Sequence, residues 1–512
     1  MKRCRTRFAG SRSVVPVILV ILVASCRDRH DPTGPSIQAG KAATEDPTVS
    51  GVVPDTARRG VTLDITINGS GFEEDAVVQL ERQGVPAEGI TTNSTTFVTS
   101  TQLMANITIA ANADTGRYDL AVITPRRKGV GIEVFGVLYE LVDVGVIGGT
   151  WSIGRAINDR GEVVGTSCTQ TCLSHAFFWS EMGGLEDLGT LPGYTRSDAF
   201  SINDRGQILG GVWCPRSDAG CGAFASEVVL WERAGELWAV KPLGISLFSE
   251  EGDINNAGHF VTGGTLYSLS QGGEEENGVL FWNRTSFGGP SQPAVPVSLP
   301  PSGAPAGRAL ARAINDLNMV AGYSGTKDWT EPVIWFRDPV GTWRILRLGH
   351  PSGDNISVPD DISEMDVTGR VRVVGNAGVI GSRDAPNHPV RWTLESDRAG
   401  GWRVLAIETL EIPVGSYRGA SVSGVNIRGE AVGHYTYRGE GGYGYQEAVK
   451  WLQDGGVEGL LPRPNGGLAR ATAINDDGRI VGSIWDDAQA CERAAFWRPP
   501  QLESTSAAIP QS

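Results

Sequence analysis

Several groups of residues in this 512-residue sequence have types and spacings that could do chemistry. Carboxylates gather in two patches, one made of Glu250, Glu251 and Asp253 and one of Asp354, Asn355, Asp360, Asp361 and Glu364. Paired carboxylates can act as general acid and base on glycosidic bonds, and their oxygen atoms can bind Ca²⁺. We expect both patches on the crossings between the repeat units described below. Acidic side chains in such loops are also often simply solvated, and the sequence leaves both interpretations open.

Cysteines form a second group. Besides Cys4 and Cys26 near the start, the chain contains Cys168, Cys172, Cys214, Cys221 and Cys491. In an oxidising compartment we expect the disulfides Cys168–Cys172 and Cys214–Cys221, each closing one loop. Cys491 is then odd, and either free or partnered differently. The alternative is a metal site on the two close cysteine pairs, but we expect disulfides and no metal.

Three of the 14 tryptophans, Trp151, Trp213 and Trp485, stand apart from the repeat described below. Together with Asp354, Asp360 and Asp361 they define the face on which we expect a ligand. The six histidines are scattered, and no nucleophile elbow, Walker loop or dinucleotide fingerprint has its strand–turn–helix context. We therefore assign no catalytic residue and expect no cofactor.

A repeat must position these residues. Residues 156–165, AINDRGEVVG, recur as SINDRGQILG at 201–210, and five further copies are anchored at Asn255, Asn315, Asp366, Asn426 and Asn475. Asn-x-x-Gly between two β runs predicts a tight hairpin whose glycine is left-handed. Asn318 replaces that glycine in the fourth copy, and asparagine tolerates the same conformation. In the fifth copy Asp366 replaces the anchor asparagine and the spacing changes, which predicts a bulge or a longer turn.

Each hairpin is followed by a strand that ends in tryptophan, at Trp179, Trp231, Trp282, Trp335, Trp392, Trp451 and Trp497. With one further strand, each unit supplies four strands, which is typical of a seven-bladed β-propeller over residues 137–498. The seventh unit lacks its fourth strand, whereas 139–147 is a strand without a unit, so we expect 139–147 to pair with 493–497 and close the propeller. The seven tryptophans are interpreted as core between blades rather than sugar platforms.

Residues 46–136 form a separate all-β domain. Apolar residues alternate at Val61, Leu63, Ile65 and Ile67, and Gly, Asn, Asp and Pro interrupt the runs. About ninety residues in short strands predict a small immunoglobulin-like β-sandwich.

The N-terminal region indicates export. Basic residues precede the short apolar run Val14–Val23, which predicts a signal peptide over residues 1–25. Residues 26–45 are predicted to be a flexible tether and 499–512 a disordered tail, because both are poor in large apolar residues. The net charge of −14 argues against a nucleic-acid partner.

Three segments resemble known families. Val23-Ala24-Ser25-Cys26 is similar to a bacterial lipobox, which implies a lipid on Cys26 and a membrane-anchored lipoprotein of the outer membrane or cell surface; an ordinary signal peptide is the alternative. The segment TINGSGF at 66–72 and the strand Gly116–Leu120 resemble IPT/TIG immunoglobulin-like domains. The segments AFFW at 176–179 and DLGTLPG at 187–193 resemble extracytoplasmic HAF repeats. These resemblances imply a fold and a location, but no activity.

The first hypothesis for function is a non-enzymatic lipoprotein in which the sandwich is a stalk and the propeller binds protein or carbohydrate at the cell envelope. The alternative is a propeller-fold carbohydrate-active enzyme, a hydrolase or lyase, with carboxylates at the mouth of the channel. A third possibility is a purely structural envelope component.

Overall fold

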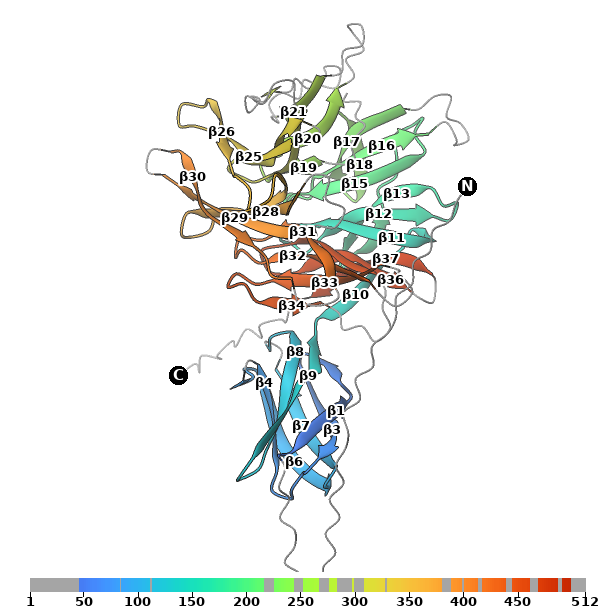
Figure 1. Ribbon diagram of the computed structural model, residues 1–512. Helices are drawn as coiled ribbons and strands as arrows, with labels where there is room; N and C mark the ends of the chain where they lie inside the picture. The colour runs from blue at the N-terminus through green and yellow to red at the C-terminus, as the bar shows by residue number, and fades with distance from the viewer. Residues whose placement is uncertain are drawn as a thin grey trace, which may run out of the picture. The chain divides into compact units, whose positions relative to one another are not determined.

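The structure is a computed structural model. It describes residues 46–82, 84–110, 113–215, 225–243, 252–266, 276–282, 297–298, 308–326, 329–379, 388–397, 400–412, 417–438, 444–460, 468–486 and 490–498. The predicted signal peptide, Cys26, the tether and the tail lie outside these residues. The described chain is all-β (Figure 1). It contains no helix long and apolar enough to cross a membrane.

Residues 48–138 form two sheets that pack face to face. One sheet has the order β1 (Thr48–Val53), β3 (Val61–Ser70), β7 (Gln102–Ile109) and β6 (Ile90–Thr99). The other has the order β2 (Thr56–Arg58), β9 (Lys128–Leu138), β8 (Gly116–Ile123), β4 (Val77–Arg82) and β5 (Val85–Pro86). Alternate residues of both sheets, among them Ile65, Ile107, Leu120 and Phe135, are buried in one shared core, as the period-2 pattern of a sandwich requires.

The rest of the chain is a succession of four-stranded antiparallel groups, which we call units 1 to 7 (Figure 1). Unit 1 is β11 (Gly148–Ile157), β12 (Val163–Thr169), β13 (Ser174–Ser180) and β14 (Gly184–Asp187). Unit 2 is β15 (Arg196–Ile202), β16 (Ile208–Cys214), β17 (Ala225–Ala234) and β18 (Leu237–Pro242). Unit 3 is β19 (Gly252–Ile254), β20 (Phe260–Leu266), β21 (Glu276–Trp282) and β22 (Val297–Ser298).

Units 4 and 5 share one sheet through a parallel bridge between Thr330 and Ile356. Unit 4 is β23 (Arg308–Ile314), β24 (Val320–Thr326), β25 (Trp329–Arg337) and β26 (Trp343–Arg347). Unit 5 is β27 (Ile356–Ile362), β28 (Arg370–Gly378), β29 (His388–Ser396) and β30 (Trp402–Thr409). Unit 6 is β31 (Tyr417–Val425), β32 (Ala431–Arg438), β33 (Gly444–Trp451) and β34 (Val457–Gly459).

Unit 7 combines the two ends of this region. It contains β35 (Ala469–Ile474), β36 (Ile480–Asp486) and β37 (Cys491–Arg498), and its fourth strand is β10 (Glu140–Gly145). The antiparallel pairing of β10 with β37 joins Leu141 to Trp497 and Gly145 to Ala494. The expected pairing of segments 139–147 and 493–497 is therefore present.

The hairpin between the first two strands of each unit has the predicted conformation. The residue at the turn is left-handed in all seven units, with φ between 57° at Asn318 and 82° at Gly478. In unit 5 the hairpin is longer, as expected, because Ser363 pairs with Arg372 while the tight turn forms further out, between Asp366 and Arg370.

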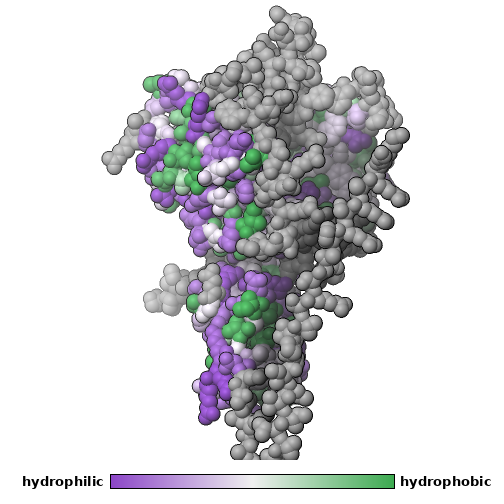
Figure 2. Space-filling model, in the orientation of Figure 1, coloured by the Kyte–Doolittle hydropathy of each residue, from purple (hydrophilic) through white to green (hydrophobic). Residues whose placement is uncertain are grey.

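The core of this region lies between neighbouring units. Six of the strand-ending tryptophans have described side chains, and all six are buried: Trp179, Trp231, Trp335, Trp392, Trp451 and Trp497. Trp231 of unit 2 packs with Val164 and Phe178 of unit 1. Phe177 and Trp179 of unit 1 in turn pack with Phe496 of unit 7. The tryptophans are thus core residues. Where Figure 2 colours the surface, hydrophilic side chains surround several hydrophobic patches.

Candidate functional site

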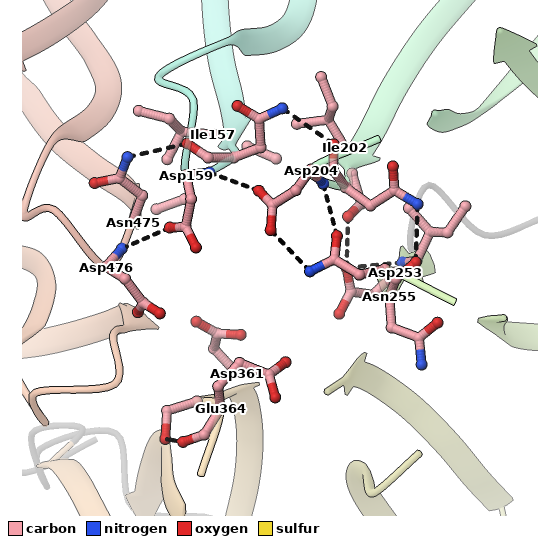
Figure 3. A pocket seen from close by; sticks show the side chains of 18 of the residues that line it. Ile157, Asp159, Ile202, Asp204, Asp253, Asn255, Asp361, Glu364, Asn475 and Asp476 are labelled. Atoms are coloured by element: carbon pink, nitrogen blue, oxygen red, sulfur yellow. Dashed lines mark hydrogen bonds between the residues drawn. The ribbon is translucent and has the colours of Figure 1, made fainter. Parts of the chain in front are cut away.

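The hairpins surround a cavity of about 200 Å³. Figure 3 shows acidic side chains from several units turned toward one space. The carboxylate residues that line the cavity are Asp159, Asp204, Asp253, Asp316, Asp361, Glu364 and Asp476, and the described lining contains no Lys, Arg or His. Every ionisable side chain in the described lining is therefore acidic.

The anchor asparagines link each unit to the next. The Nδ2 group of Asn158 donates a hydrogen bond to the carbonyl oxygen of Asn203 (3.0 Å), and Asn203 donates in the same way to Asn255 (2.8 Å). The series continues through Asn255 and Asn315, and Asn475 of unit 7 donates to Asn158 of unit 1 (3.0 Å). These asparagines are buried, and each also holds its own hairpin by accepting backbone N–H groups, as in Asn203.

The next residue along the chain makes a second series of links. The backbone N–H of Asp159 donates to the Asp204 carboxylate (2.8 Å), and the N–H of Asp204 donates to the Asn256 side chain (2.7 Å). Asn256 continues to Asp316, and Asp316 continues to Glu364. From unit 7, the N–H of Asp476 donates to the Asp159 carboxylate (2.9 Å). The carboxylates therefore hold neighbouring units together.

Units 5 and 6 depart from this scheme. Unit 6 has Ile427 at the position of the acidic residue. The link from unit 5 to unit 6 is instead made deeper in the cavity, where the N–H of Val425 donates to Oδ2 of Asp361 (2.8 Å). In unit 3, Asp253 has the equivalent position and accepts the N–H of Ile314 from unit 4 (2.8 Å). Two acidic residues thus replace the small residues found at this position in the other units.

Several carboxyl groups in the cavity have raised pKa values. Burial raises the pKa of Asp361 to about 8, and the charge of Asp253 adds to the effect. Burial, together with the charge of Asp316, raises the pKa of Glu364 to about 7, and burial raises the pKa of Asp159 to about 6. At neutral pH Asp361 is therefore mostly protonated, and Glu364 is protonated about half of the time. Among the described residues, no group of three or more His, Cys, Asp or Glu side chains is arranged to hold a metal ion.

The expected ligand face is not assembled as one surface. Trp151 lies six residues before the hairpin end of β11, while Trp213 and Trp485 each lie five residues beyond a hairpin. At about 3.3 Å per residue, these tryptophans are about 17–20 Å from the cavity end of their strands. Asp354 precedes β27 and belongs to the same distant end, whereas Asp361 lines the cavity. Asp360, between them, accepts a hydrogen bond from Asn376.

The placement of the acidic patches on the crossings between units was accordingly wrong for Asp253, Asp360 and Asp361. These residues belong to β19 and β27, the first strands of units 3 and 5, and Glu364 belongs to the hairpin. Glu250 and Glu251 lie outside the described residues. Comparing the units at the second position before the anchor would have placed Asp253 at the cavity. Asp361 was hidden because the longer hairpin moves the turn three residues away, to Asp366.

The cysteine predictions have mixed outcomes. Cys168 and Cys172 are free thiols, so the expected bond between them is absent. The reason is local: Sγ of Cys168 lies against the backbone of β11, 3.0 Å from the N–H of Thr150, whereas Cys172 is exposed in a left-handed turn. Cys214 is disulfide-bonded. Cys221, its expected partner, lies outside the described residues.

Comparisons with known proteins add little to this picture. No family model matches the sequence, and no curated protein matches it. Among solved structures, a post-proline cleaving enzyme from Rickettsia typhi is similar at 8% identity and a TM-score of 0.33, over 71% of this chain and 50% of that one. The chain therefore spans about half the length of that enzyme.

Two further structures are similar at the same low level. AofleA from Arthrobotrys oligospora has 10% identity and a TM-score of 0.34, over 64% of this chain and 92% of that one. A polysaccharide lyase of the PL25 ulvan lyase family has 11% identity and a TM-score of 0.28, over 70% and 84%. Such scores carry no argument about what this chain does.

The raised pKa values predict that stability falls as the pH rises from 7 to 9. A carboxyl whose pKa is raised by folding contributes stability that is complete below its unfolded pKa and is lost progressively until the pH has passed its folded pKa. For Asp361 that value is about 8, against an ordinary 3.8. Burial lowers the pKa values of His350 and His434, which changes stability only below their ordinary pKa of 6.5. These histidines therefore do not change the stability between pH 7 and 9. We expect a loss on the order of 1 kcal/mol from Asp361 between pH 7 and 9.

Urea unfolding at the two pH values measures this effect. Asp361→Asn should be less stable than wild type at pH 7, because an amide NH₂ cannot accept the N–H of Val425. The difference should shrink at pH 9. A difference that stays constant would show that Asp361 does not titrate in this range.

Proposed function

We propose that this chain is an exported, non-enzymatic binding protein, anchored in a bacterial envelope by a lipid on Cys26. In this proposal the IPT/TIG-like sandwich is a stalk, and units 1 to 7 are HAF-like repeats that form a closed seven-bladed β-propeller. The propeller presents a surface for protein or carbohydrate.

Contacts between the first and last units support closure. β10 completes the sheet of unit 7, and Phe496 of unit 7 packs with Phe177 and Trp179 of unit 1. The two hydrogen-bond series also return from Asn475 and Asp476 to Asn158 and Asp159. Pairing the first strand with the last sheet is the usual way for a ring of blades to avoid a free edge.

The observation that favours binding over catalysis is the engagement of the cavity carboxylates. Asp204, Asp316 and Glu364 each accept a backbone N–H from the preceding unit. Asp253 and Asp361 also accept such bonds. A general acid or base must reach the proton it transfers, whereas these groups are occupied in holding units together. The cavity is thus the structural centre of a scaffold, and the ligand surface lies elsewhere.

We place the ligand surface on Trp485, because 39% of this residue is exposed and it lies at the end of the strands opposite the cavity. Aromatic faces exposed in this way stack on sugars and peptides. We expect the full chain to bind a component of a glycan or peptide array, and Trp485→Ala to weaken that binding at least tenfold.

Leu237→Ala is the matched control, because Leu237 is a large exposed residue at the hairpin end of unit 2. Its binding should equal that of wild type. Equal losses in both variants would contradict a ligand surface at Trp485. Absence of any array signal would favour a purely structural envelope component.

The protonation pattern of the cavity favours a second candidate, a carbohydrate-active enzyme. Asp361, with a pKa of about 8, can donate a proton at neutral pH, and ionised carboxylates lie in the same cavity. Release of reducing or unsaturated sugar ends from envelope polysaccharides, abolished by Asp361→Asn, would support this candidate and overturn the non-enzymatic proposal.

A further inference from the structure

A buried polar cluster bonds the sandwich to units 6 and 7, which together with the other units form one compact part of the chain. Glu458 of β34 is 3% exposed. Its Oε2 atom accepts hydrogen bonds from Thr115 Oγ1 of the sandwich (2.9 Å) and from the Tyr139 hydroxyl (3.0 Å). Nζ of Lys450 lies 3.0 Å from the same oxygen and 3.3 Å from Glu430. One carboxylate oxygen thus joins three separate parts of the sequence.

The charges in this cluster are buried and paired. Burial opposes the charge on Lys450, but Tyr139 and the two glutamates raise its pKa above the ordinary 10.5, so Lys450 is protonated at neutral pH. Removing one partner of a buried ion pair is strongly destabilising, because the other charge is left without compensation. The cluster therefore favours a single arrangement of its members.

A related contact joins units 1 and 2 without the sandwich. Glu186 of unit 1 has the strand position of Glu458, because each follows the residue that pairs with the strand-ending tryptophan. Trp238 of unit 2 has the position of Tyr139 by the same comparison, and its Nε1–H donates to Oε2 of Glu186 (3.0 Å). Arg233 of unit 2 stacks on the Trp238 ring at 4.2 Å and bonds to Glu186 (2.6 Å).

In unit 7 the sandwich supplies what Arg233 supplies in unit 2. The residue two positions after the strand-ending tryptophan is Arg233 in unit 2 but Pro499 in unit 7. Instead, the guanidinium of Arg59 from the sandwich lies over the Tyr139 ring at 5.0 Å, and Thr115 adds its hydrogen bond to Glu458. Tyr139 is the single residue between β9 of the sandwich and β10. The strand that completes unit 7 thus begins at this cluster.

We propose that the sandwich is a structural part of unit 7, in which Arg59 and Thr115 hold Tyr139 against Glu458 and so keep β10 on its sheet. Domains of one chain usually move relative to each other unless their interface restrains them. Here the buried cluster and the one-residue connection restrain the sandwich, which makes it a fixed support rather than a hinged stalk. The proposal depends on none of export, lipid or ligand, so a failed binding assay leaves it intact.

Hydrogen exchange of the purified full chain, followed by mass spectrometry of its peptides, tests the proposal. The double variant Arg59→Ala/Thr115→Val removes both groups that the sandwich contributes and leaves Tyr139 and Glu458 unchanged. We expect the amides of β10 to exchange about tenfold faster than in wild type, because the strand leaves its sheet more often. The amides of β16 in unit 2 should exchange as in wild type.

Arg58→Ala/Thr108→Val is the matched control. Arg58 is exposed beside Arg59, and the Thr108 hydroxyl bonds to Thr62 within the sandwich (2.8 Å). Exchange of β10 should equal that of wild type in this control. Unchanged exchange of β10 in Arg59→Ala/Thr115→Val would overturn the proposal, as would an equal increase in the control.

Tyr139→Phe decides the case in which the double variant also loosens β3 and β7 in the core of the sandwich. This change keeps the ring under Arg59 and removes only the hydroxyl that bonds to Glu458. Faster exchange of β10, with β3 and β7 as protected as in wild type, supports the proposal. Wild-type exchange of β10 in Tyr139→Phe contradicts it.

Discussion

Trp231→Ala is expected to lower the free energy of unfolding by about 3–5 kcal/mol, the usual cost of truncating a fully buried tryptophan. The Trp231 side chain has no exposed surface and packs between units 1 and 2, against Val164 and Phe178. Its indole N–H also donates to the carbonyl oxygen of Leu188 (3.0 Å). Alanine would leave both a cavity and an unpaired buried carbonyl, and urea unfolding measures the sum.

Trp238→Ala is the matched control for depth of burial. Trp238 belongs to the same unit and also contacts unit 1, through Phe178 and Glu186, but it lies on the outer strand β18, where its ring is only partly buried and Arg233 stacks on it at 4.2 Å. We expect a loss of about 1 kcal/mol there. Similar losses for the two variants would show that the deep burial of Trp231 between the units is not the main source of its contribution to stability.

Asn203→Ala should cost about 2–4 kcal/mol although it removes only a small side chain, since each buried group left without a partner costs about 1–3 kcal/mol. Oδ1 of Asn203 accepts the N–H groups of Arg205 and Gln207 within its hairpin. Its Nδ2 group donates to Gln207 and to the carbonyl oxygen of Asn255 in the next unit. The substitution therefore loosens the hairpin and its link to unit 3 at once.

Arg205→Ala tests the same hairpin at its exposed tip. It should change the unfolding free energy by less than about 0.5 kcal/mol, as is usual for an exposed residue. A small effect of Asn203→Ala, close to that of the control, would mean that water replaces the lost hydrogen bonds and that the anchor asparagines are dispensable.

Much of the fold was predictable because its determinants are local and repeated. The Asn-x-x-Gly pattern places a left-handed residue at the turn whatever surrounds it, and even the exchange of glycine for Asn318 follows from backbone sterics. The burial of Trp231 and its counterparts followed from their recurrence at one strand position. The pairing of 139–147 with the last strand followed from counting strands, since an unpaired strand and an incomplete sheet satisfy each other.

The candidate site was harder to predict because it depends on which residues of different units meet. Asp253 and Asp361 looked like loop acids, yet each accepts a backbone N–H from the following unit. The Ile-Asn-Asp repeats were interpreted as turns alone, although the same Asp residues line a shared cavity. The disulfide between Cys168 and Cys172 was expected from their closeness in sequence, whereas strand direction points the Cys168 sulfur toward β11 instead.

The sequence by itself determined the all-β class, the hairpin of each unit, the buried tryptophans and the strand that pairs across the ends, because each depends on short-range conformation or on a repeated hydrophobic pattern. Only the tertiary structure decided that carboxylates from separate units share one cavity and raise one another's pKa values. It also decided that the Cys168 sulfur contacts the backbone of β11 instead of bonding to Cys172. Electrostatic coupling and bond formation both depend on distances of a few ångströms in space, and the linear order of residues carries no such distance.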